Sequence, residues 1–180
     1  MYENEILYVI DDPRIREQVR SASQTYEKIF RIPFSVLYLE KNLGFAGANN
    51  AGVKVASGEN ILLMNSDVMP SESGWLEKFL STSRGDLANS LIGSRLLYED
   101  DSIQHDGMAF YQSPFVDNLW TNLHPGKGMP TILVNGSPDS LTVDQELIDV
   151  EAVTGACIFC LLYTSPSPRD LSTSRMPSSA

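Results

Sequence analysis

The chain has 180 residues, which is enough for one domain with a buried core, and 42% of them are hydrophobic and 20% charged, as in soluble globular proteins. Its formal net charge of -10 argues against binding of nucleic acid through the phosphate backbone, since such binding needs clusters of Lys and Arg. Charged residues follow Met1 closely, so we expect no signal peptide, and the longest apolar stretch, residues 152–163, is too short to span a bilayer. These features predict a cytoplasmic protein.

The first predicted unit is a strand, a helix and a second strand. Residues 5–10 (EILYVI) are rich in β-forming residue types and stop just before Pro13, which suits the first turn of a helix. The helix is expected to continue to about Phe30, before Pro33, and residues 34–39 (FSVLYL) form the next strand. Its apolar face would consist of Ile15, Val19, Ala22, Tyr26 and Ile29. This succession predicts parallel strands with a helix packed on them.

Residues 42–70 hold the stretch around which the chain is organised. A glycine-rich turn leads into an amphipathic helix, whose C-terminal cap is expected at Gly58. The apolar face of this helix would consist of Phe45, Ala48, Val53 and Ala56. Residues 61–64 are wholly apolar, as in a strand buried on both faces, and polar residues 65–67 follow at once. Because open α/β sheets bind ligands beyond the carboxyl ends of their strands, this second strand-helix-strand unit predicts a ligand site there.

The rest of the chain predicts shorter elements. A short apolar helix face would consist of Trp75, Leu76, Phe79 and Leu80. Strands are expected at residues 91–98, at about 105–111, and at 150–159, the last with a glycine kink. Residues 113–147 are rich in Gly, Pro, Asn and Asp, which indicates a long, partly irregular loop of the kind that often serves function.

The end of the chain changes in character. Cys157 and Cys160 have C-x-x-C spacing, but no second Cys or His pair completes a zinc site, so we expect two buried core thiols. Residues 164–180 are dominated by Ser and Pro and cannot repay their ordering entropy. The run LLYTSPSPRD resembles translated sequencing-adapter DNA. We therefore expect a partial domain over residues 1–159 and a non-native, disordered tail over residues 160–180.

Three polar features follow predicted strands, and each has two interpretations. Segment 65–67 (NSD) could hold a divalent cation against a diphosphate, since Mg²⁺ takes one or two protein carboxylates and lets phosphate oxygens complete its shell, or it could be a simple Asx turn. Segment 42–50 is neither a P-loop nor G-x-G-x-x-G, and it could border a ligand or be a tight turn into a helix. Asp11 and Asp12 could accept hydrogen bonds from a base or ribose, or cap a helix.

In combination these features resemble the GT-A glycosyltransferases of family 2, and within that family the bacterial enzymes of polysaccharide and O-antigen assembly. The resemblance covers residues 5–159, and its motifs are YVIDDP, N-x-G-F-A-x-A-N-N-x-G, ASGENILLMNSDV, GWL, IGSRLLYEDDSIQHDG and VTGAC. It implies the α/β, three-layer GT-A fold of nucleotide-diphospho-sugar transferases, which is Rossmann-like with a mostly parallel sheet, here truncated at both ends. It also implies a nucleotide-sugar donor and a glycan or lipid-linked glycan acceptor.

The resemblance implies roles for single residues on the donor side. Asp11 and Asp12 would contact the donor nucleoside. Gly44, Phe45 and Asn49 would wall the nucleotide pocket.

On the catalytic side, segment 65–67 resembles the DxD motif of the family, with Asn65 in place of the first Asp. Asp67 would ligate Mg²⁺ or Mn²⁺ that bridges the donor diphosphate, and Asn65 could hydrogen-bond the ribose. Thr154, Gly155 and Ala156 would border the acceptor site. All these groups are expected to gather at one rim, with Asp12, Gly44 and Asp67 as its markers.

The sequence departs from the family pattern at both ends. It lacks a preceding strand with a P-x-Y-N-like sequence and its helix, and the later G-G-F-D-E-like motif with the catalytic base. An inverting transferase fragment with little or no activity is therefore expected, and Glu146, Asp149 and Glu151 are expected to be solvated rather than to act as the base. His105 and His124 are expected to be structural. The alternatives are a non-catalytic nucleotide-sugar-binding domain and a nucleotidyltransferase.

Overall fold

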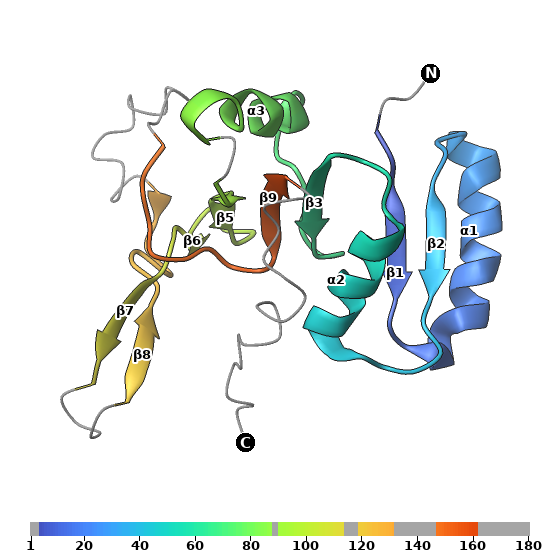
Figure 1. Cartoon of the computed structure of the whole chain (residues 1–180), viewed down its shortest axis with the longest axis horizontal. Helices are drawn as coiled ribbons and strands as arrows, with labels where there is room; N and C mark the ends of the chain where they lie inside the picture. Colours follow the sequence, from blue (N-terminus) through green and yellow to red (C-terminus); the bar gives the residue numbers. More distant parts are fainter. Residues whose placement is uncertain (1–3, 88–89, 114–118, 132–146, 162–180) are drawn as a thin grey trace. The chain divides into compact units, whose positions relative to one another are not determined.

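The computed structural model describes residues 4–87, 90–113, 119–131 and 147–161 of the chain (Figure 1). The chain divides into two compact units, one of Met1–Ile61 together with Leu161–Ala180, and one of Leu62–Cys160. Within the described ranges, no helix has the length and apolar character needed to cross a membrane.

The first unit contains the predicted strand-helix-strand arrangement. Strands β1 (Leu7–Ile10) and β2 (Ser35–Tyr38) pair in parallel, with Leu7 opposite Ser35 and Ile10 opposite Tyr38. Between them in sequence run a short 3-10 helix, η1 (Pro13–Ile15), and α1 (Arg16–Phe30). Helix α2 (Gly44–Val55) follows β2, and the two strands lie between α1 and α2 (Figure 1). The predicted α/β organisation is therefore confirmed in this unit.

Helix α2 lies very close to β1 because a glycine faces the strand. Gly52 is the buried residue of α2, and a Cβ at this position would lie 2.8 Å from Cγ2 of Val9. The prediction of a C-cap at Gly58 is wrong, since α2 ends at Val55 and Ala56 is its extended cap residue. The next turn is held by Glu5, whose carboxylate accepts hydrogen bonds from the backbone N–H (2.8 Å) and the hydroxyl (2.9 Å) of Ser57.

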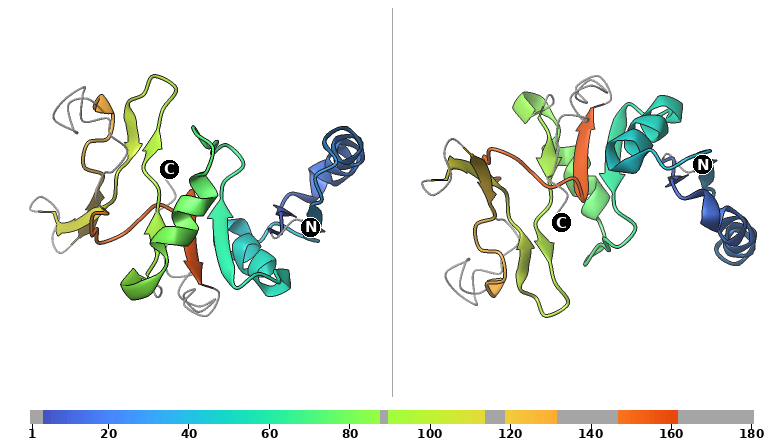
Figure 2. Two further views of the ribbon diagram at one scale, coloured as in Figure 1. Left: turned by 90° about the horizontal axis from the view of Figure 1, so that it is seen from above. Right: turned by 90° about the horizontal axis from the view of Figure 1, so that it is seen from below.

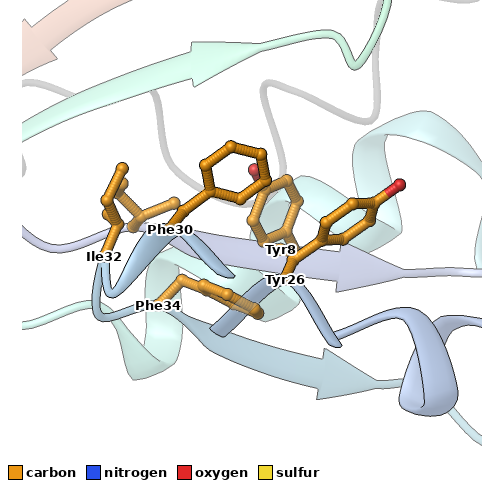
Figure 3. A pocket seen from close by; sticks show the side chains of 6 residues that line it. Tyr8, Tyr26, Phe30, Ile32 and Phe34 are labelled. Carbon is orange, nitrogen blue, oxygen red and sulfur yellow. The ribbon is translucent and has the colours of Figure 1, made fainter. Parts of the chain in front are cut away.

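The C-terminal half of α1 is open on its apolar side. Arg31, with φ of 55°, ends the helix two residues before Pro33. Tyr26, on the predicted apolar face, is 54% exposed, so that face is only partly covered. The side chains around it line an apolar hollow of about 290 Å³, shown in Figure 3. The lining residues are Ile6, Tyr8, Tyr26, Phe30, Ile32 and Phe34.

The second unit is built on a three-stranded sheet. Its order is β3 (Asn60–Met64), β9 (Cys157–Leu161) and β4 (Ile92–Gly93), with β4 antiparallel to β9. Helix α3 (Trp75–Thr82) lies over β9 in the views of Figure 2, and the 3-10 helix η2 (Gly85–Leu87) follows it. The core of this unit consists of Phe79, Leu96, Cys157 and Phe159. Both cysteines are buried, which confirms the predicted core thiols.

Two hairpins extend this unit and correct the predicted strands. Strand β5 (Leu96–Leu97) pairs with β6 (Ile103–His105), and β7 (Ala109–Gln112) pairs with β8 (Trp120–Leu123), both antiparallel. One of the four pairings with a described register is parallel, so the expectation of a mostly parallel sheet is met only in the first unit.

The predicted strand over residues 91–98 is divided into β4 and β5, which belong to different sheets. Between β4 and β5, Arg95 donates two hydrogen bonds to the carboxylate of Asp106, at 2.8 and 2.9 Å. This pair lies at the point where the chain leaves the sheet of β3, β9 and β4. The predicted strand over residues 105–111 is divided at Gly107, whose φ of 92° is incompatible with an extended strand. The predicted loop over residues 113–147 contains β8, and its residues 114–118 and 132–146 lie outside the described residues.

Candidate functional site

The segment 65–67 continues directly from β3 in the second unit. The backbone N–H of Asn65 donates a hydrogen bond to the carbonyl oxygen of Ala156 (2.9 Å), and the N–H of Val68 donates to the carbonyl oxygen of Asn65 (3.2 Å). These bonds fix a tight turn at the carboxyl end of the strand. Asp67 is exposed on this turn, and within the described residues its carboxylate forms no hydrogen bond or ion pair.

The turn at residues 65–67, predicted to hold a metal ion, is in direct contact with residues 154–156, predicted to border the acceptor. Ala156, which accepts the hydrogen bond of Asn65, also donates its own N–H to the Thr154 hydroxyl at 3.4 Å. Thr154, Gly155 and Ala156 are all half-buried, at the start of β9. The segment is therefore joined by this hydrogen bond to the turn that carries Asp67, beside the pairing of β3 with β9.

The described residues offer a cation only a small set of protein ligands. They contain no group of three or more His, Cys, Asp or Glu side chains that could hold a metal ion. Asp67, with an exposed and unpaired carboxylate, supplies one hard oxygen ligand. This donor set fits Mg²⁺ or Mn²⁺ that takes most of its remaining ligands from a diphosphate and water, because Mg²⁺ is usually held by one or two carboxylates together with substrate phosphates.

The predicted nucleotide residues of the first unit also form a connected group. Oδ1 of Asp11 accepts a hydrogen bond from the backbone N–H of Leu43, at 2.7 Å. The next N–H, of Gly44, donates to Oδ1 of Asn42 at 2.9 Å, and Gly44 has a φ of 70° that favours glycine. The end of β1 is thus tied to the start of α2. Since β1 and β2 are parallel, this is the edge at which both strands end.

Two further predicted pocket residues lie on α2. Phe45 is 55% exposed, so its ring is available to a ligand and does not belong to the core as the helical spacing predicted. Asn49 is half-buried one turn further along the helix.

Asp12 serves the helix that follows it. Its Oδ1 accepts the backbone N–H of Arg14 at 2.9 Å, which makes Asp12 the N-cap of η1. Its carboxylate also pairs with the Arg14 guanidinium through Nε (2.9 and 3.1 Å) and Nη2 (2.8 Å). The hydrogen bonds from the Arg14 side chain and backbone lower the pKa of Asp12 to about 2. The prediction that Asp12 caps a helix is thus confirmed. A nucleotide sugar bound to this carboxylate would have to share it with Arg14.

Asp12 and Gly44 belong to the first unit and Asp67 to the second, so their gathering at one rim stays a prediction. Of the three acidic residues expected to be solvated, Glu146 lies outside the described residues. Asp149 and Glu151 are exposed, and Glu151 accepts the N–H of Phe110 at 2.6 Å.

Sequence reasoning missed the role of His105. The prediction that it opens a strand is wrong, since it ends β6 and is 3% exposed. Its Nε2 accepts the backbone N–H of Thr154 at 3.1 Å and of Gly107 at 3.3 Å. A signal existed in the sequence, because the ring of a histidine two residues before a glycine can accept the N–H of that glycine, as it does here from Gly107, but the contact with Thr154 spans 49 residues.

The arrangement defines a class of protein. Parallel strands lie between two helices, and the strand ends carry carboxylates and a glycine-rich turn, which is where α/β folds bind ligands. A comparison with family models narrows the class, since the model described as glycosyl transferase family 2 matches residues 1–125. This chain therefore belongs to glycosyl transferase family 2, whose GT-A fold is of the α/β type.

A curated relative agrees with this assignment. The chain is 27% identical over 82 residues to the O-antigen biosynthesis protein RfbC of Myxococcus xanthus. The match covers 46% of this chain and 6% of that protein, so the chain spans a small part of its relative. No solved structure matches the chain.

Proposed function

We propose that this chain carries the donor- and cation-binding part of an inverting glycosyltransferase that transfers a sugar from a nucleotide-sugar donor to a glycan or lipid-linked glycan acceptor. The observation that carries the proposal is the exposed carboxylate of Asp67, unpaired among the residues that the structure describes, on a turn fixed by Ala156 at the end of β3. The family supports the nucleotide-sugar donor and the glycan acceptor, and the name of the Myxococcus relative supports a bacterial surface polysaccharide as the product.

The chemistry follows from what these side chains offer. When bound, Mg²⁺ or Mn²⁺ would neutralise charge on the leaving diphosphate. Asp67 would hold the ion, and the Asn65 side-chain amide, which brings no charge, would donate to or accept from the donor ribose. Asp11 would keep the glycine-rich turn in place beside the nucleoside, with Phe45 available to pack on the base. Thr154, Gly155 and Ala156 would border the acceptor.

The proposal extends to the activity, location and substrate of the chain. We expect little turnover from this chain alone, because the described carboxylates nearest the Thr154–Ala156 segment in sequence, Asp149 and Glu151, are exposed, and Glu151 is engaged by the N–H of Phe110. We also propose that the protein acts in the cytoplasm, where nucleotide-sugar donors are made, on a glycan rather than on nucleic acid. The acidic net charge of -10 supports a glycan rather than a nucleic acid as the substrate.

The test is a binding experiment on the full chain. Thermal shift and titration calorimetry with a panel of UDP-, GDP- and dTDP-sugars, with and without Mn²⁺, should show stabilisation that needs both the donor and the cation. Asp67→Asn should abolish the Mn²⁺-dependent part, because the amide loses the anionic oxygen. Asp101→Asn is the matched control, since Asp101 lies on the 99–102 turn with a φ of 61° that Asn tolerates.

The outcomes separate the candidate functions. If Asp67→Asn and the unmodified chain bind the nucleotide sugar equally well with Mn²⁺, Asp67 does not hold the cation. That result would favour a non-catalytic nucleotide-sugar-binding domain, an alternative supported by Asn65, which stands where the family motif has a carboxylate. Stabilisation by nucleoside triphosphates without preference for sugar donors would favour a nucleotidyltransferase instead.

A further inference from the structure

Two histidines lie together in the second unit, outside the proposed donor and cation groups. His105 ends β6, and His124 directly follows β8. Their rings lie edge to face, with an interplanar angle of 70° and centroids 5.6 Å apart. Their Nδ1 atoms are 3.4 Å apart. His105 is buried and His124 is half-buried.

The hydrogen bonds of His105 determine which nitrogen of its ring carries a proton. Nε2 of His105 accepts two backbone N–H groups, from Thr154 and Gly107, so it cannot be protonated. The neutral ring must then carry its proton on Nδ1, which donates to Nδ1 of His124. Nδ1 of His124 can accept this proton when His124 carries its own proton on Nε2. Nε2 lies 3.2 Å from Nδ2 of Asn122, so this tautomer goes with the amide orientation of Asn122 that brings Oδ1 to face Nε2.

A continuous path of hydrogen bonds leads from this pair to the proposed cation site. His105 accepts from Thr154 (3.1 Å), and the Thr154 hydroxyl accepts from Ala156 (3.4 Å). The carbonyl oxygen of Ala156 accepts from Asn65 (2.9 Å), which begins the turn that carries Asp67. Every member of the path belongs to residues 62–160, so it lies within one compact unit.

We propose that His105 is a positioning residue for the proposed transfer reaction: its unprotonated Nε2 holds the Thr154–Ala156 segment, which holds the cation turn at Asn65, and His124 lies against the Nδ1 that then carries the proton. The inference rests on the proposed function. Its physical basis is that a buried backbone N–H needs a partner, and a side chain that supplies one fixes the segment in place.

The charges around the pair favour the neutral ring. Burial lowers the pKa of His105 from its ordinary 6.5, His124 and Lys127 lower it further, and Asp106 opposes them. Since the folded pKa is below that of the unfolded chain, the unfolded state binds more protons as the pH falls through 6.5. The interaction of His105 with Thr154 is therefore fully present above this pH and weakens in acid.

Two conservative variants separate the two ring nitrogens. In His105→Gln the side-chain oxygen can take the place of Nε2 and accept from Thr154, whereas in His105→Asn the oxygen takes the place of Nδ1 and cannot reach it. Amide hydrogen exchange should show that Thr154 and Asn65 lose protection in His105→Asn and keep it in His105→Gln. Mn²⁺ binding in the presence of UDP should weaken by about tenfold in His105→Asn, as for other residues that orient a metal-binding group, and recover in His105→Gln.

The unmodified chain supplies a readout that does not depend on the folding of a variant. ¹⁵N NMR of the His105 ring should show a protonated Nδ1 and an unprotonated Nε2 at neutral pH. A proton on Nε2, or equal exchange protection of Thr154 in the two variants, would overturn the proposal. If the Asn and Gln variants differ at Thr154 and Asn65 while Asp67→Asn leaves cation binding unchanged, the positioning role stands and the proposed function fails.

Discussion

Replacement of Phe159 by alanine should remove a large part of the stability of the second unit. Phe159 lies in the middle of β9 and is 1% exposed. Its ring stacks on that of Phe79, with centroids 5.4 Å apart and an interplanar angle of 19°. It therefore joins the sheet to helix α3, and no other side chain of the cluster joins them through a stacked ring.

The expected cost follows from the buried area. An aromatic side chain buries roughly 150–250 Å², which at about 25 cal/mol per Å² gives about 4–6 kcal/mol as an upper bound, since the unfolded chain is not fully extended. Alanine retains one methyl group, and measured Phe→Ala substitutions in cores cost about 3–5 kcal/mol. We expect a loss of about 4 kcal/mol, which includes the stacking with Phe79. The free energy of unfolding of a small domain is about 5–15 kcal/mol, so this loss is about a quarter to four fifths of it.

The assay is urea unfolding of the full chain followed by tryptophan fluorescence. Trp75 packs against the core and its ring is 6.4 Å from that of Phe79, so its emission reports on the cluster. Trp120→Phe should be introduced first, because Trp120 is exposed and would add a signal unrelated to the core.

Phe110→Ala is the matched control for Phe159→Ala. Phe110 lies on β7 with 46% of its surface exposed, and its loss should cost less than about 1 kcal/mol. If the two substitutions lower the free energy of unfolding equally, the stacked cluster does not hold the unit together and the reasoning fails.

Three further predictions concern the first unit. Gly52→Ala should lower stability by about 1 kcal/mol, because the clash with Val9 exceeds the gain in helix propensity; thermal unfolding measures it. Asp11→Ala should accelerate hydrogen exchange at the Leu43 amide, which loses its acceptor. Asp12 should titrate with a pKa of about 2 by NMR, so that its contribution to stability is complete above about pH 4 and is lost as the pH falls toward 2.

Each of these predictions has its own control. In a Val9→Ala background the space opposite Gly52 opens, and Gly52→Ala should raise the stability. If Gly52→Ala still lowers the stability in that background, the clash with Val9 is not the cause. For Asp11, exchange at the amide of Lys54, in the last turn of α2, should not change, and an unchanged rate at Leu43 would contradict the hydrogen bond from Leu43 to Asp11. Arg14→Ala should return the pKa of Asp12 toward 3.8, whereas a pKa that stays near 2 would show another cause.

Local signals in the sequence were sufficient where the determining interactions are close along the chain. The acidic pair before Pro13 identified the start of the first helix, since a cap and its first turn lie within three residues. The apolar run 61–64 identified β3, and its abrupt polar end identified the turn with Asp67. The buried thiols followed from an apolar run in the same way.

Other features depend on residues far apart in the sequence. Gly58 had the expected position for a helix cap, but Glu5 holds the turn after α2 from 52 residues away. Residues 120–123 looked like part of a loop because of the flanking Gly and Pro, and they became β8 only through pairing with β7. A strand that gains its stability from its partner leaves little local signal.

The sequence by itself determined that this is an α/β chain of glycosyl transferase family 2 type, with Asp11, the glycine-rich turn and Asp67 at strand ends, because those patterns are set by neighbours in the chain. Only the tertiary structure decided that Ala156 holds the Asp67 turn and that His105 holds Thr154. Hydrogen bonds between segments separated by 49 or more residues depend on how the strands are packed, and no pattern within one segment encodes them.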